Sequence, residues 1–197
     1  MATSPQYVGP LERRSDYLPL RKVERVVLLG YMASGKSTVG EALARRIEWQ
    51  FVDFDVEIER RDGRTVQQLI EEEGEGFFRE LEAALTEELA TVRNVVLAPG
   101  GGWITRPELL EAIRSGTLSV WLRVDPAEVA RRLKNDTVDR PFKELADPTE
   151  RIAAMQAERE PLYRLADVGV PTNTRSVEQI AFEIEQLVRT RGIHEVE

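Results

Sequence analysis

The sequence predicts an α/β fold in which helices cover both faces of a parallel β-sheet. Short runs rich in β-forming residues alternate with longer helical patterns along most of the chain, an order typical of parallel sheets. The first of these runs also leads through a glycine-rich loop directly into a helical pattern. Ligands of such folds bind outside the carboxyl ends of the strands, so functional residues are expected there.

Each expected element has a local signal. The candidate strands are apolar runs bounded by turn residues, at 26–29, 50–53, 95–98, 118–123 and, more weakly, 168–171. The candidate helices lie at 36–47, 66–91, 107–114, 126–133, 148–165 and 176–189. Proline in the first turn indicates where three of them begin, and Asp125 and Asp147 are the expected N-caps of two.

Two segments exceed a minimal α/β unit. The first, at about 55–88, is a helical insert with more charge than a crossover needs, and the second, at about 134–147, is polar and has no period. An enzyme that transfers phosphate needs a region that holds the acceptor and a lid that excludes water. Two ordinary surface excursions explain the pattern equally well.

Composition limits the class of protein. The 197 residues are expected to form one domain at 23–190, between a flexible N-terminal extension at 1–22 and a C-terminal tail at 191–197. The lack of cysteine excludes disulfides and thiolate zinc sites, and the single histidine, His194, is near the chain end. A net charge of −8, no apolar span and no signal peptide argue against nucleic-acid, membrane and secretory roles. We therefore expect a cytoplasmic protein without nucleic-acid or membrane partners. We also expect a monomer, although composition does not decide the oligomeric state.

The stretch GYMASGKSTVG at 30–40 has the spacing G-x-x-x-x-G-K-[ST] of a phosphate-binding loop. Backbone N–H groups of such a loop point at phosphate oxygens, and the dipole of the following helix favours anions. Lys36 is expected to reach the β- and γ-phosphates, and the Ser37 hydroxyl to bind Mg²⁺. The stretch predicts a nucleoside triphosphate site.

Two further motifs stand at strand ends. In FVDFD, alternation along the strand would place Asp53 and Asp55 on one side, where one assists Mg²⁺ and the other accepts a proton from an acceptor hydroxyl. The alternative is a pair of acids that merely ends a strand. The glycine run at 100–102 lets a ligand approach the backbone closely, and its alternative is a plain turn.

Three arginines are further candidates: Arg79, Arg140 and Arg159. Each alone fits a solvated surface position, but together with the acid pair and the glycine run they suggest guanidinium groups that bind phosphate and carboxylate through paired hydrogen bonds. Taken in order, the motifs resemble the shikimate kinase family from about residue 23 to 189. The resemblance rests on G-x-M-x-x-G-K-S-T-V-G, F-x-D-x-D, E-G-x-F-R-x-x-E, G-G-G, R-P and R-x-P-L-Y. It implies a three-layer α/β/α P-loop kinase fold with a five-stranded parallel sheet, a helical substrate-binding insert and a lid.

The resemblance also implies residue roles. The residues implied to bind ATP are Gly35, Lys36, Ser37, Thr38, Arg132, Arg140 and Arg175. The residues implied to bind shikimate are Asp55, Arg79, Gly101, Gly102 and Arg159, with the two arginines on its carboxylate. Mg²⁺ would be held by Ser37 with support from Asp53, and the implied catalytic residues are Lys36, Asp55 and Arg140.

The implied activity is ATP-dependent phosphorylation of the shikimate 3-hydroxyl, giving shikimate 3-phosphate and ADP, in the chorismate route to aromatic amino acids. The sequence departs from the family pattern in Ala33, where glycine is usual, in RPF for RPL, and in one extra residue between Arg132 and Arg140. Two alternatives stay open. A gluconate-type kinase fits FVDFD, GGG and PLY poorly, and a non-catalytic nucleotide-binding regulator would be expected to lack Asp55, Arg79 or Arg159.

Overall fold

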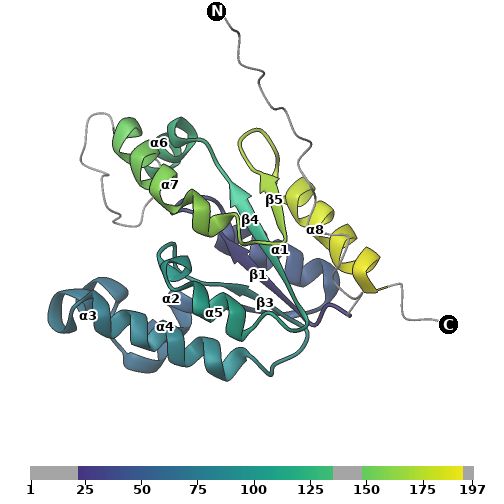
Figure 1. Ribbon diagram of the computed structural model, residues 1–197, viewed down its shortest axis with the longest axis horizontal. Helices are drawn as coiled ribbons and strands as arrows, with labels where there is room; N and C mark the ends of the chain where they lie inside the picture. Colours follow the sequence, from purple (N-terminus) through teal and green to yellow (C-terminus); the bar gives the residue numbers. More distant parts are fainter. Residues whose placement is uncertain (1–21, 135–147, 193–197) are drawn as a thin grey trace, which may run out of the picture.

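The computed structural model describes residues 22–134 and 148–192. Five parallel strands form one sheet in the order β2-β3-β1-β4-β5 (Figure 1). They are β1 (Arg25–Leu29), β2 (Gln50–Asp53), β3 (Val95–Ala98), β4 (Thr117–Arg123) and β5 (Val168–Pro171). The predicted five-stranded parallel sheet is confirmed, and two predicted strands each gain one residue at the start.

Helices cover both faces of the sheet. They are α1 (Lys36–Ile47), α2 (Phe54–Asp62), α3 (Val66–Glu73), α4 (Glu75–Leu89), α5 (Pro107–Ala112), α6 (Pro126–Lys134), α7 (Thr149–Tyr163) and α8 (Val177–Gly192), with a short 3₁₀ turn, η2, at Trp103–Thr105. Side chains of a strand alternate between faces. Val26 and Leu28 of β1 therefore pack with α1 and α8, whereas Val27 and Leu29 pack with α4 and α5. Burial of β1 on both faces accounts for the unbroken apolar run that follows Arg25, Val26–Leu29.

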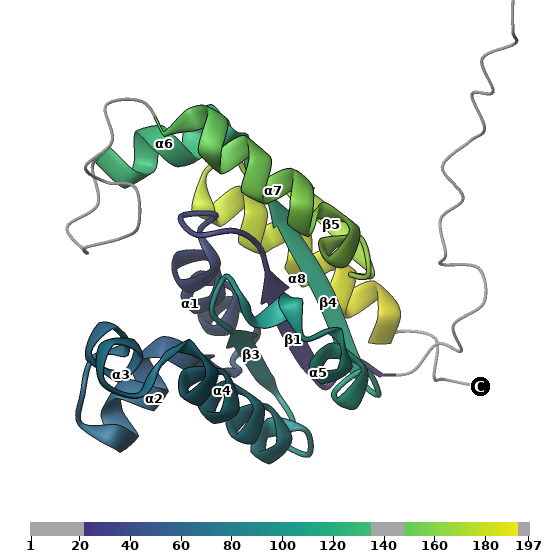
Figure 2. The ribbon, with the colours of Figure 1, turned by 60° about the vertical axis from the view of Figure 1, so that its left-hand side comes forward.

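The helical insert differs from the prediction in two ways. The expected helix at 66–91 is two helices, because Gly74 at φ 88° and ψ 160° ends α3 and precedes α4, a conformation that only glycine adopts readily. An additional helix, α2, begins directly after β2. Together α2, α3 and α4 extend beyond the β2 edge, whereas α6 and α7 lie toward β4 (Figure 2).

Two of the predicted proline starts agree with the structure, since Pro107 and Pro126 begin α5 and α6. Pro148 is instead the N-cap residue of α7, so the prediction that Asp147 caps this helix is wrong. Among the described helices, none is both long and apolar enough to cross a membrane.

Several predictions fall outside the described residues. They concern the N-terminal extension up to residue 21, the lid at 135–147 with Arg140, and the end of the C-terminal tail with His194.

Candidate active site

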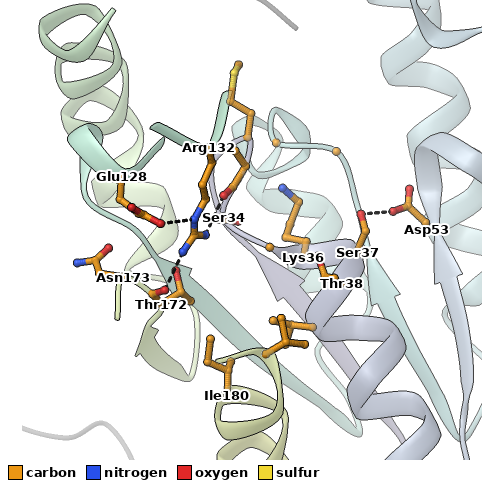
Figure 3. A pocket seen from close by; sticks show the side chains of 18 of the residues that line it. Ser34, Lys36, Ser37, Thr38, Asp53, Glu128, Arg132, Thr172, Asn173 and Ile180 are labelled. Atoms are coloured by element: carbon orange, nitrogen blue, oxygen red, sulfur yellow. Dashed lines mark hydrogen bonds and ion pairs between the residues drawn. The ribbon is translucent and has the colours of Figure 1, made fainter. Parts of the chain in front are cut away.

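A cavity of about 520 Å³ lies at the carboxyl ends of the strands, where ligands of parallel α/β sheets bind. Its walls come from the phosphate loop, the end of β2, the glycine turn after β3, α6 and the segment after β5 (Figure 3). Nine of the predicted site residues line it: Gly35, Lys36, Ser37, Thr38, Asp53, Asp55, Gly101, Arg132 and Arg175. The fold thus brings most of the nucleotide motif and both aspartates to one place.

The phosphate loop is held by backbone geometry. Gly30 has φ 154°, and a Cβ there would stand 2.9 Å from the carbonyl oxygen of Leu122, so glycine is required at this position. Gly35, at φ 98°, is the N-cap of α1, and the helix begins at Lys36. The Lys36 ammonium donates to the carbonyls of Gly30 and Tyr31, at 3.0 and 3.2 Å. The loop therefore presents a helix N-terminus and a cation at the same spot.

Ala33, where the sequence departs from the family pattern, has φ 56°. This is the left-handed region that glycine adopts freely and that costs other residues about 1 kcal/mol. The loop thus keeps a glycine-type conformation with an alanine. The Arg132 guanidinium holds it there, because it donates to the Ala33 carbonyl at 3.0 Å.

The two aspartates lie together for a different reason than strand alternation. Asp53 is the N-cap of α2, and its Oδ1 accepts from the backbone N–H groups of Asp55 and Val56. Asp55 is therefore in the first helical turn and not in the strand, so the alternation argument is wrong. The other oxygen of Asp53 accepts a hydrogen bond from the Ser37 hydroxyl at 2.5 Å. Asp53 thus joins the start of α2 to the phosphate loop.

The glycine turn after β3 leaves no room for side chains. A Cβ on Gly102 would stand 2.2 Å from Nη2 of Arg79, and one on Gly100 would stand 2.7 Å from Oε1 of Glu82. At Gly101 the nearest atom is the backbone nitrogen of Met32, at 3.3 Å. The turn is therefore enclosed by α4 and by the phosphate loop, and a side chain at Gly100 or Gly102 would displace the end of the Glu82 or Arg79 side chain.

Arg79 of α4 is fixed by two carboxylates. Its guanidinium donates to Glu82 at 2.5 Å and to Glu75 at 2.6 Å. Glu82 has no exposed surface, and burial raises its pKa, an effect that the bond from Arg79 opposes and the nearby Asp55 increases. Burial also lowers the pKa of Arg79, but its bonds with the two glutamates outweigh burial and raise it. The guanidinium is therefore cationic and held beside the glycine turn.

Arg159 reaches the same turn from α7. It donates to the carbonyl oxygen of Gly101 at 3.3 Å, and its guanidinium lies 5.8 Å from the centre of the Tyr31 ring. The Tyr163 hydroxyl donates to the same carbonyl at 3.1 Å, and burial raises the pKa of Tyr163 to about 12, so it is a donor at neutral pH. Arg79 and Arg159, 80 residues apart in numbering, thus meet at adjacent glycines.

The far end of the cavity is arranged around Arg132 (Figure 3). Besides the Ala33 carbonyl, its guanidinium donates to the carbonyl of Thr172 at 2.8 Å and to Glu128 at 2.7 Å. The hydrogen bond from Arg131, together with that from Arg132, lowers the pKa of Glu128 to about 2. Arg132 therefore connects the phosphate loop, α6 and the segment after β5. Arg175 lines the cavity too, bonded to Glu183 and to the Gln179 carbonyl.

Comparison with known proteins gives the family. The family model described as shikimate kinase matches residues 32–189. This chain belongs to the shikimate kinase family. The shikimate kinase of Moorella thermoacetica is 38% identical over 164 residues, which is 83% of this chain and 94% of that protein.

Solved structures of shikimate kinases agree with the fold. The Acinetobacter baumannii shikimate kinase, in complex with shikimate, has a TM-score of 0.78 and 32% identity, covering 87% of this chain and 96% of that one. The Bacteroides thetaiotaomicron shikimate kinase has a TM-score of 0.77 and 31% identity, covering 84% and 98%. The P-loop kinase fold predicted from the resemblance is thereby confirmed.

Some site residues of this shikimate kinase family member escaped the sequence reasoning. Glu82 lies three residues after Arg79, and that spacing on a helix was an available signal. Glu128 stands at the same spacing before Arg131. Tyr163 is the last residue of the motif R-x-P-L-Y, which was its available signal, although its bond to Gly101 spans 62 positions. Thr172 acts through a contact with Arg132, 40 positions away, and no local pattern could have identified it.

Proposed function

We propose that this protein transfers the γ-phosphoryl group of ATP to the 3-hydroxyl of shikimate. The observation that carries the proposal is the glycine turn. Its residues Gly100 and Gly101 line the nucleotide cavity, while its Gly101 and Gly102 touch the guanidinium groups of Arg159 and Arg79. A phosphate site and a two-arginine carboxylate site therefore share one wall. Membership in the family and the likeness to a shikimate-bound relative support the same acceptor.

The nucleotide half is assigned to the phosphate loop. Backbone N–H groups at the start of α1 and the Lys36 ammonium would hold the β- and γ-phosphates. Gly35, Ser37 and Thr38 belong to the same helix start. Arg132 and Arg175, which line the far end of the cavity, are the proposed neighbours of the adenine. Arg140, outside the described residues, stays a prediction as a lid residue that reaches the phosphates.

Ser37 and Asp53 fit a magnesium ion. Mg²⁺ prefers oxygen ligands and is held in kinases by one or two protein groups together with the substrate phosphates. The hydroxyl and carboxylate oxygens of these residues stand 2.5 Å apart beside the phosphate loop. When bound, the ion would neutralise charge that spreads over the γ-phosphoryl group. Asp53 would also fix the position of the start of α2 relative to the ion, because it is the N-cap of that helix.

In the proposed reaction, the acceptor hydroxyl oxygen bonds to the γ-phosphorus, the bond from that phosphorus to the bridging oxygen breaks, and ADP leaves. Asp55 accepts the hydrogen bond of the hydroxyl and takes its proton. The role is supported by its position, because Asp55 lines the nucleotide cavity and its carboxylate lies near Gly100, next to the glycines that contact the two arginines. Protein groups do little covalent chemistry in phosphoryl transfer, so positioning and charge supply most of the rate.

Arg79 and Arg159 would hold the shikimate carboxylate. A planar guanidinium donates two parallel hydrogen bonds to a carboxylate. The two groups sit on different helices, α4 and α7, so a carboxylate between them also fixes the orientation of the ring. The carboxylate is thereby kept away from the triphosphate, whose negative charge would repel it.

The test is release of ADP from Mg-ATP in the presence of shikimate, quinate or gluconate. We expect shikimate to accelerate release far more than the other two acids. Asp55→Asn should lower kcat by about 10²- to 10⁴-fold, the usual worth of a general base, while the affinity for an ATP analogue changes little. Equal rates with shikimate and gluconate would favour a gluconate-type kinase. No acceleration by any acid, with ATP still bound, would favour the non-catalytic regulator.

A further inference from the structure

A buried tryptophan follows the glycine turn and is bonded to α4. Trp103 is 1% exposed and packs in the core on the α4 face of the sheet. Its indole Nε1–H donates to the hydroxyl oxygen of Thr86 at 2.9 Å. The Thr86 hydroxyl in turn donates to the carbonyl of Glu82 at 2.7 Å. The Thr86 hydroxyl thus donates its proton within α4, and its oxygen accepts the hydrogen bond from the indole N–H.

The turn that precedes Trp103 has little rigidity of its own. Three consecutive glycines have wide conformational freedom, and the backbone bonds within the segment are from Trp103 to Gly100 and from Thr105 to Gly102, both at 3.0 Å. A bond from outside is needed to fix where the turn stands relative to α4. The Glu82 carboxylate accepts one such bond from the backbone of Gly100, and the indole N–H supplies a second one residue after Gly102.

The position of the turn decides the spacing of the two arginines. Gly102 is so close to Arg79 that a methyl group would not fit between them. The carbonyl of Gly101 accepts from Arg159. A shift of the turn away from α4 would therefore move the Arg159 contact relative to Arg79, because α4 carries Arg79 itself.

We propose that Trp103 is a positioning residue for the acceptor site. Its indole N–H, bonded to Thr86, holds the glycine turn against α4 and so sets the distance between the carboxylate-binding groups of Arg79 and Arg159. The inference rests on the proposed function, because it concerns the affinity for the acceptor. Packing alone would not require the N–H, since a buried donor lowers stability unless it is bonded.

The test compares four variants with the wild type, through KM for shikimate, KM for ATP and the melting temperature. Thr86→Val has the shape of threonine and removes the acceptor, whereas Thr86→Ser keeps it. Trp103→Phe removes the donor but leaves part of the indole volume empty. The double variant Trp103→Phe with Thr86→Val has neither polar group, so no buried donor is left without a partner.

We expect Thr86→Val and Trp103→Phe each to raise the KM for shikimate about two- to tenfold, the worth of one hydrogen bond, while the KM for ATP stays within twofold. Thr86→Ser should behave as the wild type. If the two changes were additive, the double variant would lose as much stability as both single variants together. We expect it to melt at a higher temperature than that sum predicts, and to keep the raised KM for shikimate. Trp49→Phe is the matched control, because Trp49 packs near the core on the opposite, α1 face, and it should leave both KM values unchanged.

Two results would overturn the inference. One is a double variant in which KM for shikimate recovers together with stability, which would make the bond purely structural. The other is an unchanged KM for shikimate in Thr86→Val, measured on folded protein. A wild-type protein that does not respond to shikimate would instead refute the proposed function, so the two failures are told apart by the wild type alone.

Discussion

Replacing Gly102 by alanine is a direct test of the acceptor site. The residue has φ −94° and ψ −8°, a conformation that alanine adopts without backbone strain. The added methyl carbon would stand 2.2 Å from Nη2 and 2.7 Å from Cζ of Arg79. Gly102→Ala therefore acts through the guanidinium and leaves the chain itself unstrained.

The size of the effect follows from how firmly Arg79 is held. Ordinary contacts between heavy atoms need about 3.5 Å, so the guanidinium must retreat by more than about 1 Å. Bonds of 2.5 Å to Glu82 and 2.6 Å to Glu75 oppose this movement. A carboxylate placed for the original position would lose a charge-assisted bond worth about 1.5–3 kcal/mol. We expect the KM for shikimate to rise about ten- to a hundredfold.

The assay is steady-state ADP release with shikimate and ATP varied separately, together with titration by an ATP analogue. Gly76→Ala is the matched control. Gly76 lies in the first turn of α4, the helix that carries Arg79, and a Cβ there meets nothing within 4 Å. The control should leave both KM values unchanged, while Gly102→Ala changes only that for shikimate. A Gly102→Ala protein with the wild-type KM for shikimate would refute the placement of Arg79 in the acceptor site.

Two further predictions concern the nucleotide half. Because Ala33 has φ 56°, Ala33→Gly should change the free energy of unfolding by less than about 1 kcal/mol. The β-branched Ala33→Val should lower the free energy of unfolding by about 2 kcal/mol or more and weaken binding of an ATP analogue. Equal melting temperatures of the two variants would contradict this prediction. The Glu128 carboxylate has its pKa lowered from 4.5 to about 2, so its contribution to stability is present above its unfolded pKa and is lost as pH falls toward its folded pKa. Glu128→Gln should therefore melt below the wild type at pH 7, and this difference in melting temperature should narrow between about pH 5 and pH 2. A difference that does not depend on pH would contradict a role of the Glu128 charge in stability.

The sequence was sufficient for the sheet and most of the helices because their signals are local. The runs that form β2, β3 and β5 begin and end at the predicted residues, since each contains valine or phenylalanine, which favour strands. Helix α1 follows in the same way from the phosphate-loop pattern. For these elements tertiary contacts and local preference agree, which is the usual condition for a reliable prediction.

The errors arose where one residue serves two purposes. Asp53 is the last residue of β2, as predicted, but it is also the N-cap of α2, a position that aspartate prefers. The helix therefore begins before Asp55, and strand alternation does not apply to that residue. Gly74 lies inside the helix predicted at 66–91, where a helical glycine would cost about 1 kcal/mol. Its positive φ breaks the helix and gives α4, which carries Arg79, an independent direction.

The burial of polar groups could be predicted only in part. Glu82 ends the motif E-G-x-F-R-x-x-E, three residues after Arg79. Its complete burial, rare for a glutamate unless it is paired, follows from the packing of α4 against the glycine turn. The Trp103–Thr86 bond spans 17 positions and the Arg132–Ala33 bond spans 99. Such contacts follow from the packing of whole elements, which no window of sequence contains.

The two halves of the site are therefore built differently, and this difference predicts how each responds to change. The phosphate half depends on backbone conformation at Gly30 and Gly35 and on a helix start, features that few side-chain substitutions elsewhere would disturb. The acceptor half depends on a chain of side chains, in which Glu82 orients Arg79 and Thr86 holds Trp103 beside the glycine turn. Because Glu82, Thr86 and Trp103 are buried and each link is bonded, the loss of any one is expected to affect the next. Substitutions in α4 should thus change the affinity for the acceptor far more often than that for ATP.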